Sequence, residues 1–419
     1  LEVRTEAQTT RLLMQGQAVT GVEWRQGGDV RTAQARREVI LCGGVVNSPQ
    51  LLMLSGIGPG EHLRSMGLDV VHDLPAVGQN LQDHLLVRVQ HACRLPITMH
   101  SLLRADRAVR AVVQAMLFGS GPASKFPLLT GALVKTRPEL DHPDIQCHFL
   151  PGLSTAAVRW NPFAKAGPDD GHGFFANAYQ LRPESSGELR LASADPFEAP
   201  RITANYLATE TDRRTIRDAV KLLRRIFAQP AFDPYRDREL SPGDGIQSDQ
   251  EIDGWVRETA ESVFHPVGTC RMGVGADAVV DGNLQVHGIR GLRVVDASVM
   301  PRMPSCNTHG QTAEVGNEER CDAGEYGFQR QILCHAVQHE NIDPDGWCNH
   351  ADFHDHDIDN APPDRIEPHA NNQRIDKRQG DHHRSNGVKN AAENQIHDLQ
   401  QQDDQQRVEV QRLDIIDHG

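Results

Sequence analysis

The amino-acid sequence predicts a protein of the α/β class, and three patterns carry this prediction. A short unbroken apolar run at 39–42 stops at two glycines, and a second apolar run within 291–298 stops at Asp296. Short runs of this kind are typical of parallel strands that are buried on both faces of a sheet. Residues 209–230 repeat apolar side chains at helical spacing. Buried strands combined with amphipathic helices define the class.

The first predicted elements are strands. Residues 18–25 have strand character, and the strand within 37–44 ends at Gly43 and Gly44. Glycines at the end of a buried strand allow another group to approach the backbone closely. This strand end is therefore a candidate binding position.

A short helix is predicted next. Ser48 can act as its N-cap, and Pro49 suits the first helical position. Gly56 would end the helix in the left-handed conformation. The simplest interpretation of this stretch is a structural helix with clear start and stop signals.

A longer helix is predicted in the middle of the chain. Thr209 and Asp212 resemble a capping box at its start, and Pro230 lies just past its end. Its outer face is basic, which we interpret as a solvated face rather than a binding patch because the surrounding chain is acidic. The basic residues are Arg213, Arg214, Arg217, Lys221, Arg224 and Arg225.

The strand within 291–298 leads into Asp296, Ala297 and Ser298. Ligands gather at the carboxyl ends of strands in open α/β sheets, so this stretch is a candidate cofactor edge. A plain helix N-cap explains Asp296 almost as well.

Composition limits the classes of function. The chain has 419 residues, of which 38% are hydrophobic and 5% aromatic, and a formal charge of −14. This length allows two or three domains. Net acidity argues against nucleic-acid binding, which needs clustered Lys and Arg. The sequence contains no apolar run of about 18 residues, so we predict no membrane span. The eight cysteines form no C-x-x-C pair, which favours free thiols in a cytoplasmic setting; a targeting segment upstream is left open.

The apolar deficit is concentrated at 321–419. This stretch holds 10 of the 21 histidines and shows almost no apolar periodicity, so we expect solvated disorder there. A metal-binding protein is an alternative interpretation, with ligands at His354, Asp355, His356 and Asp357. No fold would fix the geometry of these ligands, so we predict no metal site.

The segment VFHPVGTCRMG at 263–273 raises the question of chemistry. His265 could be a catalytic base, a metal ligand or a buried ring in a tight loop. Isolated motifs elsewhere are weak: GVGADA at 273–278 and GSGPAS at 119–124 lack the strand and helix of a nucleotide site. GLSTA at 152–156 lacks the second glycine of a nucleophile elbow.

Several long segments together resemble the glucose–methanol–choline (GMC) flavoprotein oxidoreductases. They are GGVVNSPQLLMLSGIGPGEHLRSMGLDVVHDLPAVGQNLQDH at 43–84, LRPESSGELRLASADPFEAPRITANYL at 181–207, FHPVGTCRMG, and VVDGNLQVHGIRGLRVVDASVMPRMPSCNT. The resemblance covers about 1–312. It implies a partial Rossmann-like FAD-binding domain and an α+β substrate domain with a mainly antiparallel sheet. The implied divisions are 1–94 for the partial FAD domain, 95–258 for the substrate domain, 259–320 for a catalytic end that returns to the FAD domain, and 321–419 for the tail.

The resemblance implies FAD-dependent oxidation of a small-molecule alcohol, with oxygen or a quinone-type compound as electron acceptor. By motif position His265 matches the family's base, and a neutral histidine can accept the hydroxyl proton. Asn307 matches a second active-site position and could donate a hydrogen bond to the developing alkoxide. The implied cofactor contacts are Gly43, Gly44, Asp296, Ala297, Thr308 and Thr312.

The sequence also departs from the family pattern. The G-x-G-x-x-G unit and the first signature are absent, so we expect an N-terminally truncated fragment with little FAD affinity. The alternative function is an inactive, cofactor-free fragment of such an enzyme. After Asn307 the family pattern fails, and we expect a lost coding frame or a joined unrelated sequence near residue 312, with a natural acidic tail as the milder alternative. With four Trp and four Tyr, none clustered, we identify no cage for a quaternary ammonium, which favours an aliphatic or aromatic alcohol other than choline.

Overall fold

The computed structural model describes residues 2–124, 130–155, 158, 160, 171–305 and 307–315. The predicted polar tail at 321–419, with its rejected metal cluster at 354–357, lies outside the described residues. So does nearly all of the sequence that the expected change of frame near residue 312 concerns.

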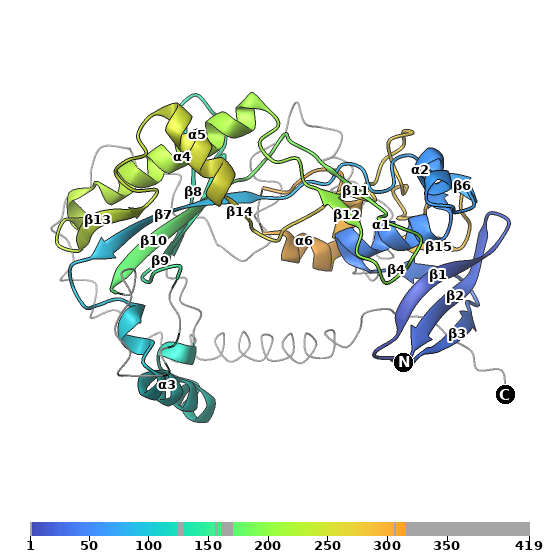
Figure 1. Cartoon of the computed structure of the whole chain (residues 1–419), viewed down its shortest axis with the longest axis horizontal. Coiled ribbons are helices and arrows are strands. Elements are labelled where there is room, and N and C mark those ends of the chain that lie inside the picture. Colours follow the sequence, from blue (N-terminus) through green and yellow to red (C-terminus); the bar gives the residue numbers. More distant parts are fainter. Residues whose placement is uncertain are drawn as a thin grey trace, which may run out of the picture.

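A mainly antiparallel sheet forms one lobe of the molecule (Figure 1). Its strand order is β13-β7-β10-β9-β8, with β14 also paired to β7. The strands are β7 (Leu85–Cys93), β8 (Thr130–Val134), β9 (Ile145–Leu150), β10 (Gly173–Gln180), β13 (Arg236–Ser241) and β14 (Glu261–Ser262). All pairings in this sheet are antiparallel. The predicted α/β class with a mainly antiparallel second sheet is confirmed.

Two helices, α4 (Glu210–Phe227) and α5 (Asp249–Thr259), cover one face of this sheet (Figure 1). One half of the predicted capping box of α4 is present, because the Thr209 side chain accepts a hydrogen bond from the backbone N–H of Asp212. The reciprocal bond is replaced, since the N–H of Thr209 donates to the hydroxyl of Ser185 at 3.4 Å. Apolar residues of α4 pack on the inward side chains of β7, β9 and β10, so that this face is buried. The opposite face of the sheet carries Leu86, Arg88, His148, Asn177 and Tyr179, which the strand registers place side by side.

The basic face of α4 is exposed at Arg214 and Arg225, as predicted, but it is partly buried elsewhere. Arg217 is paired with Asp253 of α5 through two hydrogen bonds of 2.7 and 2.6 Å. Arg224 binds Glu239 of β13 at 2.6 Å. These guanidinium groups join α4 to its neighbours because the bidentate geometry of Arg suits a partly buried carboxylate.

The second lobe contains an antiparallel meander and a parallel strand pair (Figure 1). The meander consists of β1 (Gln8–Gln15), β2 (Ala18–Gln26) and β3 (Asp29–Gln34). Strand β4 (Val39–Leu41) pairs in parallel with β15 (Leu292–Val294), which brings two distant parts of the chain together. Both predicted buried strands are therefore confirmed, and they are neighbours in one sheet.

Helix α1 (Gly44–Leu54) follows β4 and begins earlier than the sequence predicts. The predicted N-cap Ser48 and first-turn Pro49 are wrong, because Gly43 is the N-cap and both residues lie inside the helix. Pro49 has no N–H to donate to the carbonyl of Val45; the hydroxyl of Thr269 donates to that carbonyl instead, at 2.7 Å. A contact from a distant segment thus makes an internal proline acceptable. Gly56 follows the helix with a φ of +80°, as predicted.

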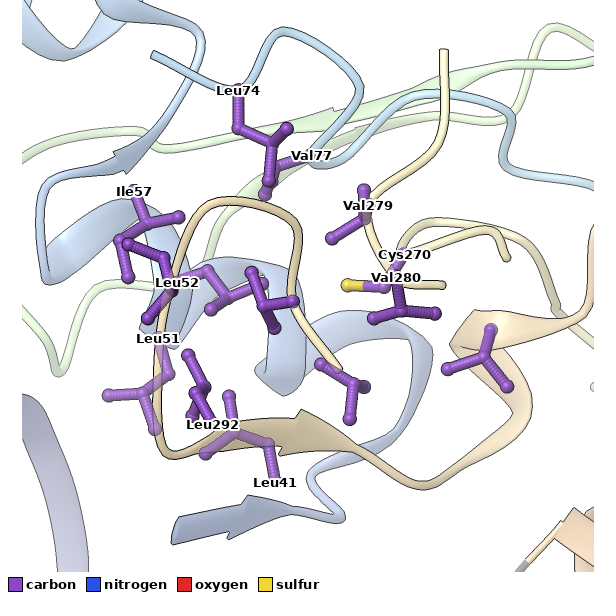
Figure 2. Packing of buried hydrophobic residues seen from close by; sticks show 14 of the residues in the cluster. Leu41, Leu51, Leu52, Ile57, Leu74, Val77, Cys270, Val279, Val280 and Leu292 are labelled. Carbon is purple, nitrogen blue, oxygen red and sulfur yellow. The ribbon is translucent and has the colours of Figure 1, made fainter. Parts of the chain in front are cut away.

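The hydrophobic core of the second lobe is assembled from distant segments. Figure 2 shows Leu41 of β4 and Leu292 of β15 packed near Leu51 and Leu52 of α1. Cys270, from the segment of His265, is fully buried in the same cluster. This packing anchors the segment of His265 in the core of the lobe.

The remaining elements complete the described chain. They are α2 (Gly60–Ser65), β5 (Ile57–Gly58), β6 (His72–Asp73), α3 (Ala105–Phe118), β11 (Glu188–Arg190), β12 (Arg201–Thr203), α6 (Thr308–Val315) and the 3₁₀ turns at Met99–Leu102, Pro122–Ser124, Pro230–Phe232 and Ala297–Val299. The described part of the chain has no helix long and apolar enough to cross a membrane. The rejected glycine motif at 273–278 lies in turns. The predicted domain limits at 94 and 258 remain predictions.

Candidate active site

Asp296 joins the two strand ends that the sequence singled out. Its carboxylate accepts hydrogen bonds from the N–H of Gly44 at 2.9 Å and from the hydroxyl of Ser48 at 2.6 Å. It also accepts from the N–H of Ser298 at 2.8 Å, which caps the 3₁₀ turn. Both interpretations of Asp296 therefore describe real contacts: it caps a turn, and it holds the first turn of α1 against the end of β15.

The glycine pair leaves the start of α1 free of side chains. A Cβ on Gly43 would lie 3.0 Å from the Cβ of Asn47 and 3.1 Å from the backbone nitrogen of Ser48, which is tighter than most real Cβ contacts. Gly44 has a φ of +74° and open space beside it. A cavity of about 350 Å³ adjoins this corner, lined by residues of the N-terminal segment, β1, β4 and α1 that include Cys42, Gly43 and Ser48.

The remaining predicted cofactor contacts lie along the same side of the molecule. Ala297 begins the 3₁₀ turn after Asp296. Thr308 is buried in the first turn of α6, and Thr312 donates its hydroxyl to the Thr308 carbonyl at 2.8 Å. The structure brings Gly43, Gly44 and Asp296 into one hydrogen-bonded corner; Thr308 and Thr312 belong to a separate element that packs near the turn at Ala297–Val299.

The segment of His265 is held by residues 77–84. The N–H of Gln82 donates to the carbonyl of Val267 at 3.1 Å, and the N–H of Val267 donates back at 2.8 Å. Gly268 has a φ of +97°, and a Cβ there would lie 2.3 Å from the carbonyl oxygen of Asn80. Only glycine permits this approach. Contacts of Gln82 with Val267 and of Asn80 with Gly268 therefore fix the backbone of this loop.

The same segment touches the Asp296 corner. The N–H of Cys270 donates to the carbonyl of Ser298 at 2.8 Å. Thr269 contacts the carbonyl of Val45 in α1, as described above. His265 and the predicted cofactor corner are therefore parts of one hydrogen-bonded unit.

Asp83 fixes the backbone around His265. One carboxylate oxygen accepts the backbone N–H of His265 at 2.9 Å. The other accepts the hydroxyl of Tyr206 at 2.6 Å and the hydroxyl of Ser262. Burial, together with the hydrogen bond to this carboxylate, raises the pKa of Tyr206 well above its ordinary value, so its hydroxyl stays protonated and keeps donating to Asp83.

The imidazole of His265 is half-buried, and burial lowers its pKa below the ordinary 6.5. The negative charge of Asp83 opposes this change but does not reverse it. A histidine with a lowered pKa is neutral at pH 7 and can accept a proton. The environment of His265 therefore suits a general base.

His84 contacts His265 directly. The Nδ1 atoms of the two rings are 3.1 Å apart, and Nε2 of His84 lies 3.1 Å from the carbonyl oxygen of Leu181. The side chain of His84 is fully buried, and burial lowers its pKa to about 4. At neutral pH His84 is an uncharged partner of the predicted base.

Tyr179 links the sheet to Asn307. Its hydroxyl donates to Oδ1 of Asn307 at 3.0 Å, and its ring lies 6.2 Å from that of His265, edge to face. Because Oδ1 of Asn307 accepts from Tyr179, the amide NH₂ group is oriented away from the tyrosine and can donate elsewhere. His265 and Asn307 are thus brought together around one tyrosine of β10.

Sequence reasoning missed Asp83, His84 and Tyr179. Asp83 and His84 close the VGQNLQDH segment, which carried the family resemblance without any role for these two residues. The sequence did contain a usable signal. Asp83 and His84 are polar residues directly before a buried strand, and such a departure from the apolar pattern can mark a functional position. Tyr179 gave no local signal, because its partner lies 128 positions away in the sequence.

Solved structures identify the class of this fold. A formate oxidase from Aspergillus oryzae matches with a TM-score of 0.69 and 29% identity, covering 78% of this chain and 60% of that one. Pyridoxine 4-oxidase from Mesorbium loti matches with a TM-score of 0.62 and 27% identity, covering 77% of this chain and 58% of the other. The fold is that of FAD-dependent oxidoreductases.

Family models and curated relatives then identify the family. Two models described as GMC oxidoreductase match residues 1–86 and 183–316. An oxygen-dependent choline dehydrogenase from Chromohalobacter salexigens is 42% identical over 312 residues, 74% of this chain and 55% of that protein. One from Brucella ovis is 43% identical over 336 residues, 80% of this chain and 59% of that protein. The chain belongs to the GMC oxidoreductase family, as its sequence resemblance implied, and spans between half and two thirds of the length of these relatives.

Proposed function

We propose that the protein oxidises an alcohol to an aldehyde or ketone, with FAD as the electron-accepting cofactor and His265 as the general base. The observation that carries this proposal is the neutral, half-buried His265 held beside Asn307 through Tyr179. Family membership supports the oxidoreductase class and its cofactor. The two side chains supply the proton acceptor and the hydrogen-bond donor that alcohol oxidation needs.

Oxidation of the alcohol removes one proton and one hydride. The alcohol loses its hydroxyl proton to His265, and its carbon loses a hydride as the C=O bond forms. A bound FAD would supply the hydride acceptor, which no amino-acid side chain provides. The amide of Asn307 donates to the substrate oxygen while that oxygen carries negative charge. His265 then holds one proton until solvent removes it.

The residues at the Asp296 corner fit a bound FAD. The side-chain-free start of α1, the open space beside Gly44 and the adjoining cavity leave room for a group to approach the backbone. Gly43, Gly44, Asp296 and Ala297 are proposed contacts on this side, and Thr308 and Thr312 are proposed contacts from α6. The hydrogen bonds of Asp296 to the N–H of Gly44 and the hydroxyl of Ser48 would keep this corner in place.

The substrate is proposed to be an uncharged alcohol rather than choline. The sheet face around Tyr179 presents Leu86 and Arg88 from β7. Arg88 is bound to Asn177 and paired with Glu261 at 3.2 Å, so this carboxylate already has a cationic partner. A quaternary ammonium needs an aromatic cage or a free carboxylate. The names of the relatives favour choline, which makes substrate choice a direct test.

Oxygen is the proposed electron acceptor, since both curated relatives are named as oxygen-dependent; a quinone-type acceptor is the alternative. A cytoplasmic location and the absence of nucleic-acid partners stay predictions from composition.

The test is oxygen consumption by the FAD-supplemented protein with benzyl alcohol, 1-butanol and choline, each followed by identification of the carbonyl product. We expect product with a neutral alcohol and a lower kcat/KM for choline. Oxidation of choline alone would contradict the substrate proposal. Failure with all three alcohols, and with a quinone acceptor in place of oxygen, would contradict the proposed activity.

A further inference from the structure

His84 is a fully buried histidine whose two ring nitrogens both have partners. Nε2 lies 3.1 Å from the backbone carbonyl oxygen of Leu181, and Nδ1 lies 3.1 Å from Nδ1 of His265. The ring also lies 5.1 Å from that of Tyr179. Aromatic neighbours on one side and a carbonyl on the other hold the ring in one orientation.

The carbonyl of Leu181 determines which nitrogen of His84 carries the proton. A carbonyl oxygen can only accept a hydrogen bond, so Nε2 of His84 must donate and must be protonated. A neutral imidazole carries one proton, which leaves Nδ1 of His84 as an acceptor. His265 must then donate its own Nδ1–H across the 3.1 Å contact.

We propose that His84 is a positioning residue that fixes the tautomer of His265, so that Nδ1 of His265 is protonated and its Nε2 carries the lone pair that accepts the substrate proton. The role rests on two successive contacts, from the Leu181 carbonyl to His84 and from His84 to His265. Its catalytic consequence rests on the proposed alcohol oxidation, but the tautomer itself does not.

The reversed arrangement is disfavoured by its contacts. If His84 donated from Nδ1, its unprotonated Nε2 would face the carbonyl oxygen of Leu181 with no hydrogen between two acceptors. A buried polar group left without a partner costs about 1–3 kcal/mol. Histidine tautomers in water differ by less than this, so the carbonyl decides the outcome.

A doubly protonated His84 is the second alternative, since it could donate to both partners. Burial opposes the charge and holds the pKa of His84 near 4, although the carbonyls of Leu181 and Pro304 and the carboxylate of Asp83 favour the protonated form. The nearby His265 disfavours it further. At pH 7.5 the neutral form of His84 therefore predominates.

The direct test is a long-range ¹H–¹⁵N NMR spectrum of the protein with ¹⁵N-labelled histidine at pH 7.5. We expect the His265 signals to show a protonated Nδ1 and an unprotonated Nε2, and the His84 signals to show the reverse. Loss of one set of signals in His265→Gln and of another in His84→Asn assigns the two residues. A protonated Nε2 on His265 would overturn the proposal, and this measurement on the unsubstituted protein needs no variant to fold.

Variants of His84 separate positioning from packing. In His84→Asn the amide oxygen can replace Nδ1 as the acceptor, so His265 should keep its tautomer. In His84→Leu the acceptor is lost, the Nε2–H form of His265 should appear, and kcat should fall about tenfold or more with little change in KM. Rescue of kcat by Asn relative to Leu supports the role, whereas equal values in both variants contradict it.

The matched control is His91→Leu. His91 is also buried, but its Nδ1 contacts the carbonyl of Asp237, away from His265. Its substitution should lower the melting temperature without changing the His265 signals or kcat. An absence of alcohol oxidation in every form, with the expected tautomer present, would contradict the proposed function and leave the positioning role supported.

Discussion

His84 lies directly before β7 and His91 lies near the other end of that strand, and both are buried histidines with a pKa lowered by burial. Each places one ring nitrogen near a backbone carbonyl. Their second nitrogens differ. Nδ1 of His84 contacts His265, whereas Nε2 of His91 lies 3.8 Å from Glu239, a carboxylate already bound by Arg224.

The comparison shows that burial alone does not make a histidine part of an active site. His91 packs against Phe174 and Phe227 beneath α4 and joins β7 to β13. His84 contacts His265, whose backbone N–H is held by Asp83 and whose imidazole is only half-buried. The partner of the second nitrogen decides whether the ring is structural or connected to the site.

The largest expected effect comes from removing the proposed base, His265. His265→Gln should lower kcat/KM for the alcohol by about 10²–10⁴-fold, since the hydroxyl proton loses its acceptor. Steady-state oxygen consumption measures this change. His91→Gln is the control for loss of an imidazole away from the site and should stay within about twofold of the unsubstituted protein. Comparable losses in both variants would contradict the distinction between a structural histidine and the proposed base.

The next effect concerns the donor to the substrate oxygen. Asn307→Ala should lower kcat by about 10²-fold or more, as expected when one preorganised donor to a developing oxyanion is removed. Tyr179→Phe should have a smaller effect, about tenfold, because the amide remains but loses the hydroxyl that orients it. A Tyr179→Phe loss larger than that of Asn307→Ala would show that the tyrosine acts directly on the substrate.

Parts of this site could be predicted from the sequence, and the reasons are local. His265 and Asn307 stand in long motifs whose residue order is recognisable, and the buried strands at β4 and β15 are visible as apolar runs. The start of α1 was mispredicted because Ser48 and Pro49 satisfy local capping rules. In the structure, Ser48 instead bonds to Asp296, 248 positions away, and Thr269 compensates for Pro49.

The contacts around His265 could not be predicted for the same reason. His84 and His265 are 181 positions apart, and His84 and Leu181 are 97 apart. Hydrogen bonds of this sequence separation depend on how the lobes pack, and no periodic pattern records them. The predicted roles of His265 and Asn307 stay proposals until the variants are measured.

A moderate effect is expected on the pH dependence of kcat/KM, which reports the pKa of His265. The neutral form of His265 is the proposed proton acceptor, and burial lowers the pKa of His265. The rate should therefore rise with pH along an acid limb centred below 6.5 and reach a plateau above it. Asp83→Asn should move this limb to still lower pH, because the carboxylate of Asp83 raises the pKa of His265. A limb centred above 6.5 would contradict the burial argument.

The last expected effect is on stability in acid rather than on activity. His84 has a folded pKa of about 4 against an ordinary value of 6.5, so the unfolded chain binds its proton first as the pH falls. The contribution of His84 is fully present above pH 6.5 and is lost at up to about 1.4 kcal/mol per pH unit on the way down to about 4. Urea unfolding between pH 7 and 4.5 measures this loss.

A matched variant isolates the share of His84 in that loss. His84→Asn removes the titrating group and should flatten the pH dependence of the unfolding free energy over this range. His91→Asn should also flatten it, because burial lowers the pKa of His91 as well. An unchanged slope in His84→Asn would mean that His84 does not stay neutral in the folded protein.

The most direct test of the central claim is anaerobic mixing of the FAD-loaded protein with a primary alcohol, followed by flavin absorbance near 450 nm (roughly the oxidised flavin band). The account predicts that the absorbance falls in the unsubstituted protein and in His91→Gln, with a rate that increases with pH up to the plateau. It predicts a fall at least about 10²-fold slower in His265→Gln. Equal rates of bleaching in the unsubstituted protein and in His265→Gln would contradict the assignment of His265 as the base.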